Sequence, residues 1–133
     1  MALLVGDVFR QAADATPHRV AATVGDDRIT FAELDQASNR VAHALANAGV
    51  TYGDRIAWWG DTSMTALPVF GGLAKLGAAF APVDGRLGPA EAGVVVGCAR
   101  PRLLVVDETR RDAGEEAAAI AGVQCVADLE VRA

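Results

Sequence analysis

The sequence predicts an α/β fold of the three-layer type, with a mainly parallel sheet and an N-terminal β-hairpin. From residue 55 onward, short apolar runs alternate with stretches of helical length. This alternation is typical of parallel strands joined by right-handed helical crossovers. Before residue 31, a glycine–aspartate cluster separates two short β-branched runs, which indicates a hairpin.

Length and composition restrict the classes of function. The chain has 133 residues and is 52% hydrophobic, so it can form one domain or part of a larger one. Its 12 basic residues are outnumbered by 17 acidic ones and are not gathered into one patch. A nucleic-acid partner is therefore disfavoured.

The two cysteines and the N-terminus indicate a cytoplasmic protein. Cys98 and Cys125 lie in apolar surroundings without CxxC spacing, so we expect them to be small core residues in a reducing compartment. The apolar run after Met1 is too short for a signal peptide and lacks a charged segment before it.

The N-terminal region predicts a short helix followed by the hairpin. Val8, Phe9 and Ala12 have helical spacing over residues 7–15, and Pro17 ends the helix. The hairpin has a strand over residues 20–24, a turn at 25–27 and a return strand over 28–30.

The next helix has clear signals at both ends. Thr30 is a favourable N-cap, and Glu33 three residues later completes a capping box. Gly49 supplies the left-handed residue that ends the helix. The apolar stripe consists of Leu34, Ala37, Val41, Ala44, Leu45 and Ala48.

The rest of the chain repeats a strand–helix unit. The predicted strands cover residues 55–59, 78–83, 103–106 and 123–126, and the helices end near 77 or cover 89–98 and 109–121. Residues 64–83 are long enough to span a membrane, but their prolines and glycines favour a buried helix followed by a strand. Residues 128–133 resemble a tail.

Six segments, in order, resemble the amino-terminal third of the adenylate-forming superfamily. They are residues 17–21, 29–34, 37–45, 49–57, 75–83 and 86–87. The run from Lys75 through Pro82 to Arg86 is more similar to acyl-CoA synthetases than to the amino-acid-activating domains of peptide synthetases. Gly85, Asp61 and the pair Trp58-Trp59 depart from the family pattern.

The resemblance implies that residues 1–133 are a segment of the large N-terminal domain of an AMP-forming acyl-CoA synthetase. Such enzymes use ATP, magnesium and coenzyme A to convert a fatty acid first to an acyl-adenylate and then to a thioester. The family's phosphate loop, magnesium ligand and catalytic lysine lie downstream of these residues. We therefore expect no catalytic, cofactor-binding or metal-binding residue here, and an inactive chain whose partner is the remainder of its own polypeptide.

Two features could be mistaken for phosphate-binding groups. Lys75 lies near the end of an apolar helix, where we expect it to reach water and to complement the helix dipole. Residues 60–63 join a strand to a helix, but Asp61 would repel a phosphate, so we expect an ordinary N-cap there.

Glycines and tryptophans are expected to serve packing. Gly71 and Gly72, followed by Gly77, fall inside a helix and not at a strand–helix turn, which indicates close helix packing and not a dinucleotide site. Trp58 and Trp59 are neighbours on a strand and so point to opposite faces. At most one of them can line any single pocket.

The remaining polar candidates are expected to be solvated. His18 and His43 lack a neighbouring carboxylate or serine arrangement for acid–base chemistry. The acidic residues around the last predicted helix are interleaved with Arg110 and Arg111, which favours a self-paired surface over a metal site.

Three hypotheses remain open at this stage. The first is a segment of a longer acyl-CoA ligase, with an exposed sheet edge that promotes self-association. The second is a standalone non-catalytic α/β module used for dimerisation or partner binding. The third is a small flavodoxin-like or Rossmann-like nucleotide binder, which would require a phosphate loop that the sequence lacks.

Overall fold

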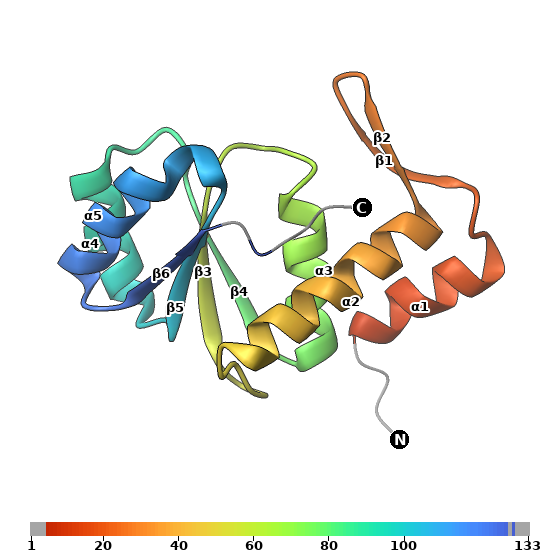
Figure 1. Cartoon of the computed structure of the whole chain (residues 1–133), viewed down its shortest axis with the longest axis horizontal. Coiled ribbons are helices and arrows are strands. Elements are labelled where there is room, and N and C mark those ends of the chain that lie inside the picture. The colour runs from red at the N-terminus through yellow and green to blue at the C-terminus, as the bar shows by residue number, and fades with distance from the viewer. Residues whose placement is uncertain (1–4, 128, 130–133) are drawn as a thin grey trace.

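The computed structural model describes residues 5–127 and Leu129 (Figure 1). Its elements are α1 (Val5–Ala15), β1 (Val20–Val24), β2 (Asp27–Thr30), α2 (Phe31–Asn47), β3 (Arg55–Trp59), α3 (Ala66–Leu76), β4 (Ala79–Val83), α4 (Pro89–Ala99), β5 (Leu103–Val106), the 3-10 turn η1 (Glu108–Arg110), α5 (Arg111–Ala121) and β6 (Gln124–Ala127). The predicted α/β class, parallel sheet and N-terminal hairpin are confirmed.

The sheet has the strand order β4-β3-β5-β6, and every neighbouring pair is parallel. Helices α2 and α3 lie on one face and α4 and α5 on the other, which gives three layers (Figure 1). The antiparallel hairpin of β1 and β2 forms a separate small sheet. Its turn is the two-residue type, with Gly25 at a φ of 59°.

Strand β3 divides the core into two hydrophobic clusters. Trp58 packs among side chains of α2 and α3, whereas Trp59 packs among side chains of α4 and α5. Their exposed fractions are 3% and 1%. The prediction that the two rings face opposite layers is confirmed, as is their role in the core.

Both predicted signals at the ends of α2 are present. The Thr30 N–H donates to Glu33 Oε1 at 2.9 Å, and the Glu33 N–H donates to Thr30 Oγ1 at 3.1 Å. Gly49 has a φ of 91°, in the left-handed region that favours glycine. These bonds satisfy donors that the first turn of a helix otherwise leaves unpaired.

Two helix starts differ from the expectation. Helix α3 begins only at Ala66, after Thr65, whose side chain makes no capping bond, so the N-cap predicted within residues 60–63 is wrong. The physical reason is that the Asp61 carboxylate is engaged by Arg110 instead. Helix α5 begins at Arg111 because the preceding turn is 3-10.

Helix α1 turns a different residue inward from the one expected. Val8 is 52% exposed, whereas Gly6 is buried against the backbone of α3. A Cβ at Gly6 would lie 2.6 Å from Lys75 Cα, so only glycine permits this approach. Through this contact, the first turn of α1 packs against the C-terminal end of α3.

Within the described residues, no helix combines the length and apolar character needed to cross a membrane. The stretch at 64–83 forms α3 and β4, as predicted. Of the predicted tail, residue 128 and residues 130–133 lie outside the described residues. Leu129 is buried in the cluster beneath α2 and α3, so it is not part of a solvated tail.

Helices α2 and α3 approach closely because glycines line their contact. A Cβ at Gly71 would lie 2.2 Å from Ser38 Oγ, and one at Gly72 would lie 2.6 Å from Val41 Cγ1. Both distances are well below van der Waals contact. The predicted packing role of these glycines is confirmed.

We expect Gly71→Ala to lower the free energy of unfolding by about 1–3 kcal/mol, because the added methyl group collides with Ser38 across a well-packed interface. The matched control is Gly97→Ala in α4, where the nearest atom, Ala121 Cα, would be 3.8 Å away. That change should be neutral or stabilising by up to about 1 kcal/mol, since alanine favours helix over glycine. Urea unfolding measures both, and equal effects would contradict the close-packing account.

Candidate functional site

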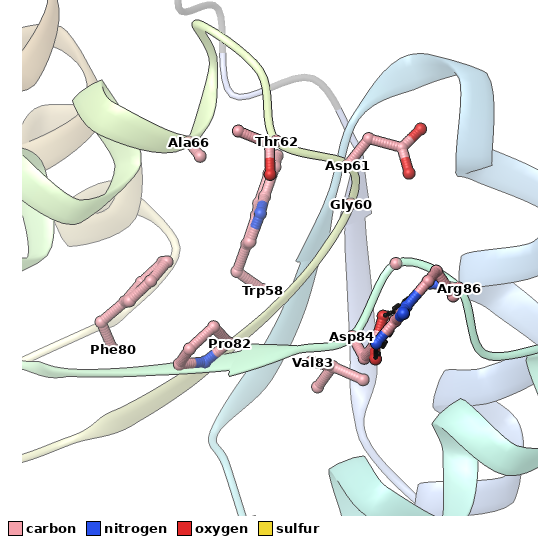
Figure 2. A pocket seen from close by; sticks show the side chains of 11 residues that line it. Trp58, Gly60, Asp61, Thr62, Ala66, Phe80, Pro82, Val83, Asp84 and Arg86 are labelled. Carbon is pink, nitrogen blue, oxygen red and sulfur yellow. Dashed lines mark hydrogen bonds and ion pairs between the residues drawn. The ribbon is translucent and has the colours of Figure 1, made fainter.

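A cleft of about 470 Å³ opens at the carboxyl ends of β3 and β4 (Figure 2). Its apolar wall consists of Trp58, Ala66, Phe80 and Pro82, and its polar rim of Asp61, Thr62, Asp84 and Arg86. Of the two tryptophans, only Trp58 lines this cleft, in agreement with the prediction that one pocket can use at most one of them.

Beside the cleft, Arg110 joins the segments that follow three strands. Its Nη2 donates to Asp61 Oδ1 at 2.7 Å and to the Gly85 carbonyl oxygen at 3.0 Å. Its guanidinium carbon lies 5.0 Å from the centroid of the Trp59 ring, within cation–π range. The Arg110 side chain is only 17% exposed. The sequence predicts that Arg110 lies on an exposed, self-paired surface, and that prediction is wrong for this residue.

Two further contacts fix the same loops. The Trp59 indole N–H donates to the Asp84 carbonyl oxygen at 3.2 Å. A Cβ at Gly85 would lie 2.6 Å from the Gly60 carbonyl oxygen and 2.9 Å from Asp61 Oδ1. The loop after β4 can therefore approach the loop after β3 only with glycine at position 85.

The position of Arg110 matters because parallel sheets commonly bind ligands where neighbouring strands send their helices to opposite faces. Here β3 and β5 are neighbours, and α3 and α5 cover opposite faces. At this point Arg110 and Asp61 bind each other. The two charged groups at this position are thus already paired with each other.

The charges on the cleft rim are paired as well. Arg86 donates from its backbone N–H, Nε and Nη2 to the Asp84 carboxylate at 2.9–3.3 Å. Hydrogen bonds from the Arg86 side chain and then from its backbone lower the pKa of Asp84 to about 2. Asp84 is therefore ionised at neutral pH and bound to the neighbouring guanidinium.

Lys75, the single lysine, does not extend to water as expected. Its Nζ binds the Asp35 carboxylate and donates to Asn39 Oδ1 at 2.6 Å, and its side chain is 16% exposed. Because α2 packs so closely on α3, these α2 groups lie within reach of the lysine and replace its hydration. Lys75 is structural, but through an interhelical ion pair.

The histidines lie as predicted, and Arg111 pairs with a neighbouring acidic residue on the surface. His18 and His43 are exposed. Arg111 donates to the Glu108 carboxylate at 2.6 and 2.8 Å on the surface of the last helix. Among the described residues, no group of three or more potential ligands is placed to hold a metal ion.

Around the cleft and at the end of α3, the cationic side chains are not free to bind the phosphates of ATP. A phosphate site requires available cations or clustered backbone amides, and Lys75, Arg86 and Arg110 are each bound to a carboxylate. The strand–helix turn after β3 carries Asp61, whose charge opposes a phosphate. The expectation that this chain holds no catalytic or cofactor-binding residue stays a prediction.

The two cysteines differ from each other in exposure. Cys98 is exposed on α4, so the expectation that it is a core residue is wrong, whereas Cys125 is partly buried against the α4–α5 layer. Burial, followed by the charge of Glu115, raises the pKa of the Cys125 thiol to about 11. Cys98 follows the apolar run Val94 to Val96, but Val94 and Val95 are themselves exposed, so apolar neighbours in the sequence do not indicate burial here.

We expect Arg110→Met to lower the free energy of unfolding by about 1–3 kcal/mol. The change removes the cation over the Trp59 ring and the hydrogen-bond donor to Asp61 and to the Gly85 carbonyl. Arg110→Lys should recover less than half of this, since an ammonium cannot stack flat while donating to two loops. The control, Arg111→Met, alters an exposed ion pair and should cost less than about 1 kcal/mol. Urea titrations followed by tryptophan fluorescence measure all three, and equal losses for Arg110 and Arg111 would contradict the joining role.

We expect a thiol reagent such as Ellman's reagent to label Cys98 rapidly at pH 8 and to leave Cys125 unlabelled until the protein unfolds. With a pKa of about 11, roughly one Cys125 in a thousand is a thiolate at that pH. Cys98→Ser should abolish the fast phase and Cys125→Ser should leave it unchanged. Rapid labelling of both thiols would show that Cys125 is accessible in the native state.

The sequence of this chain is similar to known ligases and peptide synthetases. The family profile described as "AMP-binding enzyme" matches residues 9–132. A medium/long-chain-fatty-acid–CoA/3-oxocholest-4-en-26-oate–CoA ligase of Mycobacterium marinum is 35% identical over 86 residues, which are 65% of this chain and 16% of that protein. Tyrocidine synthase 2 of Brevibacillus parabrevis is 35% identical over 85 residues, 64% of this chain and 2% of that protein.

Solved structures agree with these relationships. The inhibitor-bound N-terminal domain of FACL13 from Mycobacterium tuberculosis superposes with a TM-score of 0.84 at 26% identity, over 95% of this chain and 33% of that one. A putative long-chain-fatty-acid CoA ligase from Rhodopseudomonas palustris gives 0.81 at 29% identity, over 94% and 32%. This chain thus spans about a third of these structures and 16% of the mycobacterial ligase. Because the profile covers nearly all of its sequence, the chain belongs to the AMP-binding enzyme family.

Proposed function

We propose that this chain is the amino-terminal structural segment of an AMP-forming acyl-CoA ligase and is inactive by itself. The observation that carries the proposal is the family match over residues 9–132, together with a fatty-acid–CoA ligase as a 35% identical relative. In this proposal, ATP, magnesium, coenzyme A and the carboxylic acid bind to parts of the ligase outside these residues.

The contacts of the described residues support a framework role. Lys75, Arg86 and Arg110, the cationic groups at the end of α3 and around the cleft, each bind a carboxylate. If Lys75 or Arg110 turned to bind a phosphate, Asp35 or Asp61 would lose its cation. The contact between the elements that these pairs join would then be weakened. The segment therefore supplies a fixed set of strand ends against which the rest of a ligase can be assembled.

Partner and location follow from the same proposal. We propose that the main partner is the remainder of the ligase polypeptide, because large apolar side chains such as Tyr52, Val94 and Ile120 are 79%, 62% and 49% exposed. Such a surface also supports self-association of the chain when it is alone. We propose a cytoplasmic location, which the two unbridged cysteines support.

We expect the 133-residue chain to form no AMP and no acyl-CoA when it is incubated with ATP, magnesium, coenzyme A and a panel of straight-chain and aromatic carboxylic acids. The product of the complete reading frame should form both from at least one acid. Liquid chromatography of AMP and of the thioesters measures this, and the intact mass of each protein identifies what was assayed.

The outcomes of this assay separate the hypotheses. AMP formation by the 133-residue chain would contradict its inactivity, and a longer product that activates no acid would contradict the ligase assignment. A reading frame that ends at Ala133 would replace the proposal with a non-catalytic module for dimerisation or partner binding.

A further inference from the structure

Two neighbouring hollows lie beside α3 and the edge of the sheet. The first is the cleft already described, of about 470 Å³, the second has about 360 Å³, and Phe80 lines both. The second hollow is bordered by Val5, Tyr52, Phe70 and Ala74. We call the two together the β4 groove.

The walls of the β4 groove are apolar on a side of α3 that faces away from α2. Ala66, Phe70 and Ala74 recur every four residues and line the groove, whereas Val69 and Leu73 are fully buried in the core. A helix that is apolar on both sides is typical of one covered on both sides. Helix α1 covers part of this side, with the Phe9 ring 6.1 Å from the Phe70 ring, and leaves the rest open. Tyr52 is 79% exposed and Phe70 38% exposed, so this wall carries large rings in contact with solvent.

The strand that borders the groove has an outer edge without a partner among the described strands. Strand β4 is the last in the order β4-β3-β5-β6 (Figure 1). The Ala79 N–H donates to the Asp54 carbonyl oxygen, toward β3, at 2.8 Å. Because successive residues of a strand alternate in direction, the Phe80 N–H and carbonyl point to the outer edge.

Pro82 limits what this edge can pair with. It also points its carbonyl outward but has no N–H, so the edge offers a single donor at Phe80 and two acceptors, at Phe80 and Pro82. This pattern of donors and acceptors allows a short strand to pair with β4 but does not allow a long ladder of backbone hydrogen bonds. Figure 2 shows the Phe80 and Pro82 side chains rising from β4 on the side of the sheet where Trp58 lies.

We propose that a short strand from the ligase polypeptide outside residues 1–133 pairs with the outer edge of β4 and places apolar side chains in the β4 groove. This inference rests on the proposed function. It uses strand addition, in which backbone hydrogen bonds fix the added segment and alternate side chains occupy pockets.

The occupant follows from the size of the related domain. The N-terminal domain of FACL13 contains the equivalent of 95% of this chain in 33% of its own length. Two thirds of such a domain therefore lies outside the described fold and is held beside it in one polypeptide. A second copy is the weaker occupant, because two β4 edges related by a two-fold axis at Phe80 would exchange only one pair of hydrogen bonds before Pro82 removes the donor.

The test is amide hydrogen exchange, resolved to single residues by fragmentation mass spectrometry. In the product of the complete reading frame, the Phe80 amide should exchange at least 100-fold more slowly than in the 133-residue chain. The Ala81 amide is the internal control, because it points toward β3 and should be protected in both proteins. Acyl-CoA formation by the same longer preparation reports separately on the proposed function.

A pair of variants tests the groove wall in the longer protein alone. Tyr52→Ser should lower its melting temperature by several degrees, while Tyr52→Phe, which keeps the ring, should not. In the 133-residue chain both changes should be nearly neutral, since the side chain is 79% exposed there.

Each outcome decides the inference. Slow exchange of the Phe80 amide in the longer protein, together with a lower melting temperature of its Tyr52→Ser variant, supports the proposed strand pairing. This result does not require the short chain to fold. Fast Phe80 exchange in a longer protein that forms acyl-CoA overturns this inference alone. Protection of Phe80 that rises with the concentration of the 133-residue chain assigns the edge to a second copy and overturns it, and a reading frame ending at Ala133 overturns both proposals.

Discussion

The burial of β3 on both faces and both edges is the constraint on which the rest of the fold depends. Its residues from Ile56 to Trp59 are all buried, and it is paired to β4 on one side and to β5 on the other. A strand that presents tryptophan to each face requires an apolar layer on each face. The two helical layers, and the crossovers that place α3 on one face and α4 on the other, meet that requirement.

The network at the carboxyl end of β3 follows from the same burial. The buried Trp59 has an indole N–H that needs an acceptor, and the loop after β4 supplies the Asp84 carbonyl. One face of the ring is covered by Arg110, and the charge of Arg110 is balanced by Asp61. Each group satisfies the one before it, so a position that binds ligands in other doubly wound sheets is closed here by protein groups.

Local signals predicted most of the fold, and the errors lie where a distant partner decides. The capping box of Thr30 and the tight turn of the hairpin depend on residues within a few positions, and both are confirmed. The sequence predicts an N-cap within residues 60–63, but Asp61 of that segment binds Arg110, 49 residues away. Lys75 was expected to extend to water, but Asp35, 40 residues away, binds it. Periodicity in one sequence contains no information about either pairing.

These long-range pairs also determine how rigid the outer side of α3 is. The glycines at 71 and 72 hold one side of the helix against α2, and Lys75 is bound to α2 at its end. Phe70 on the other side packs edge-on against Phe80 of β4, with ring centroids 5.6 Å apart. Helix α3 cannot rotate without losing contacts on both sides. The β4 groove is therefore formed before anything occupies it, and a docking segment would not have to order α3, which lowers the entropy cost of association.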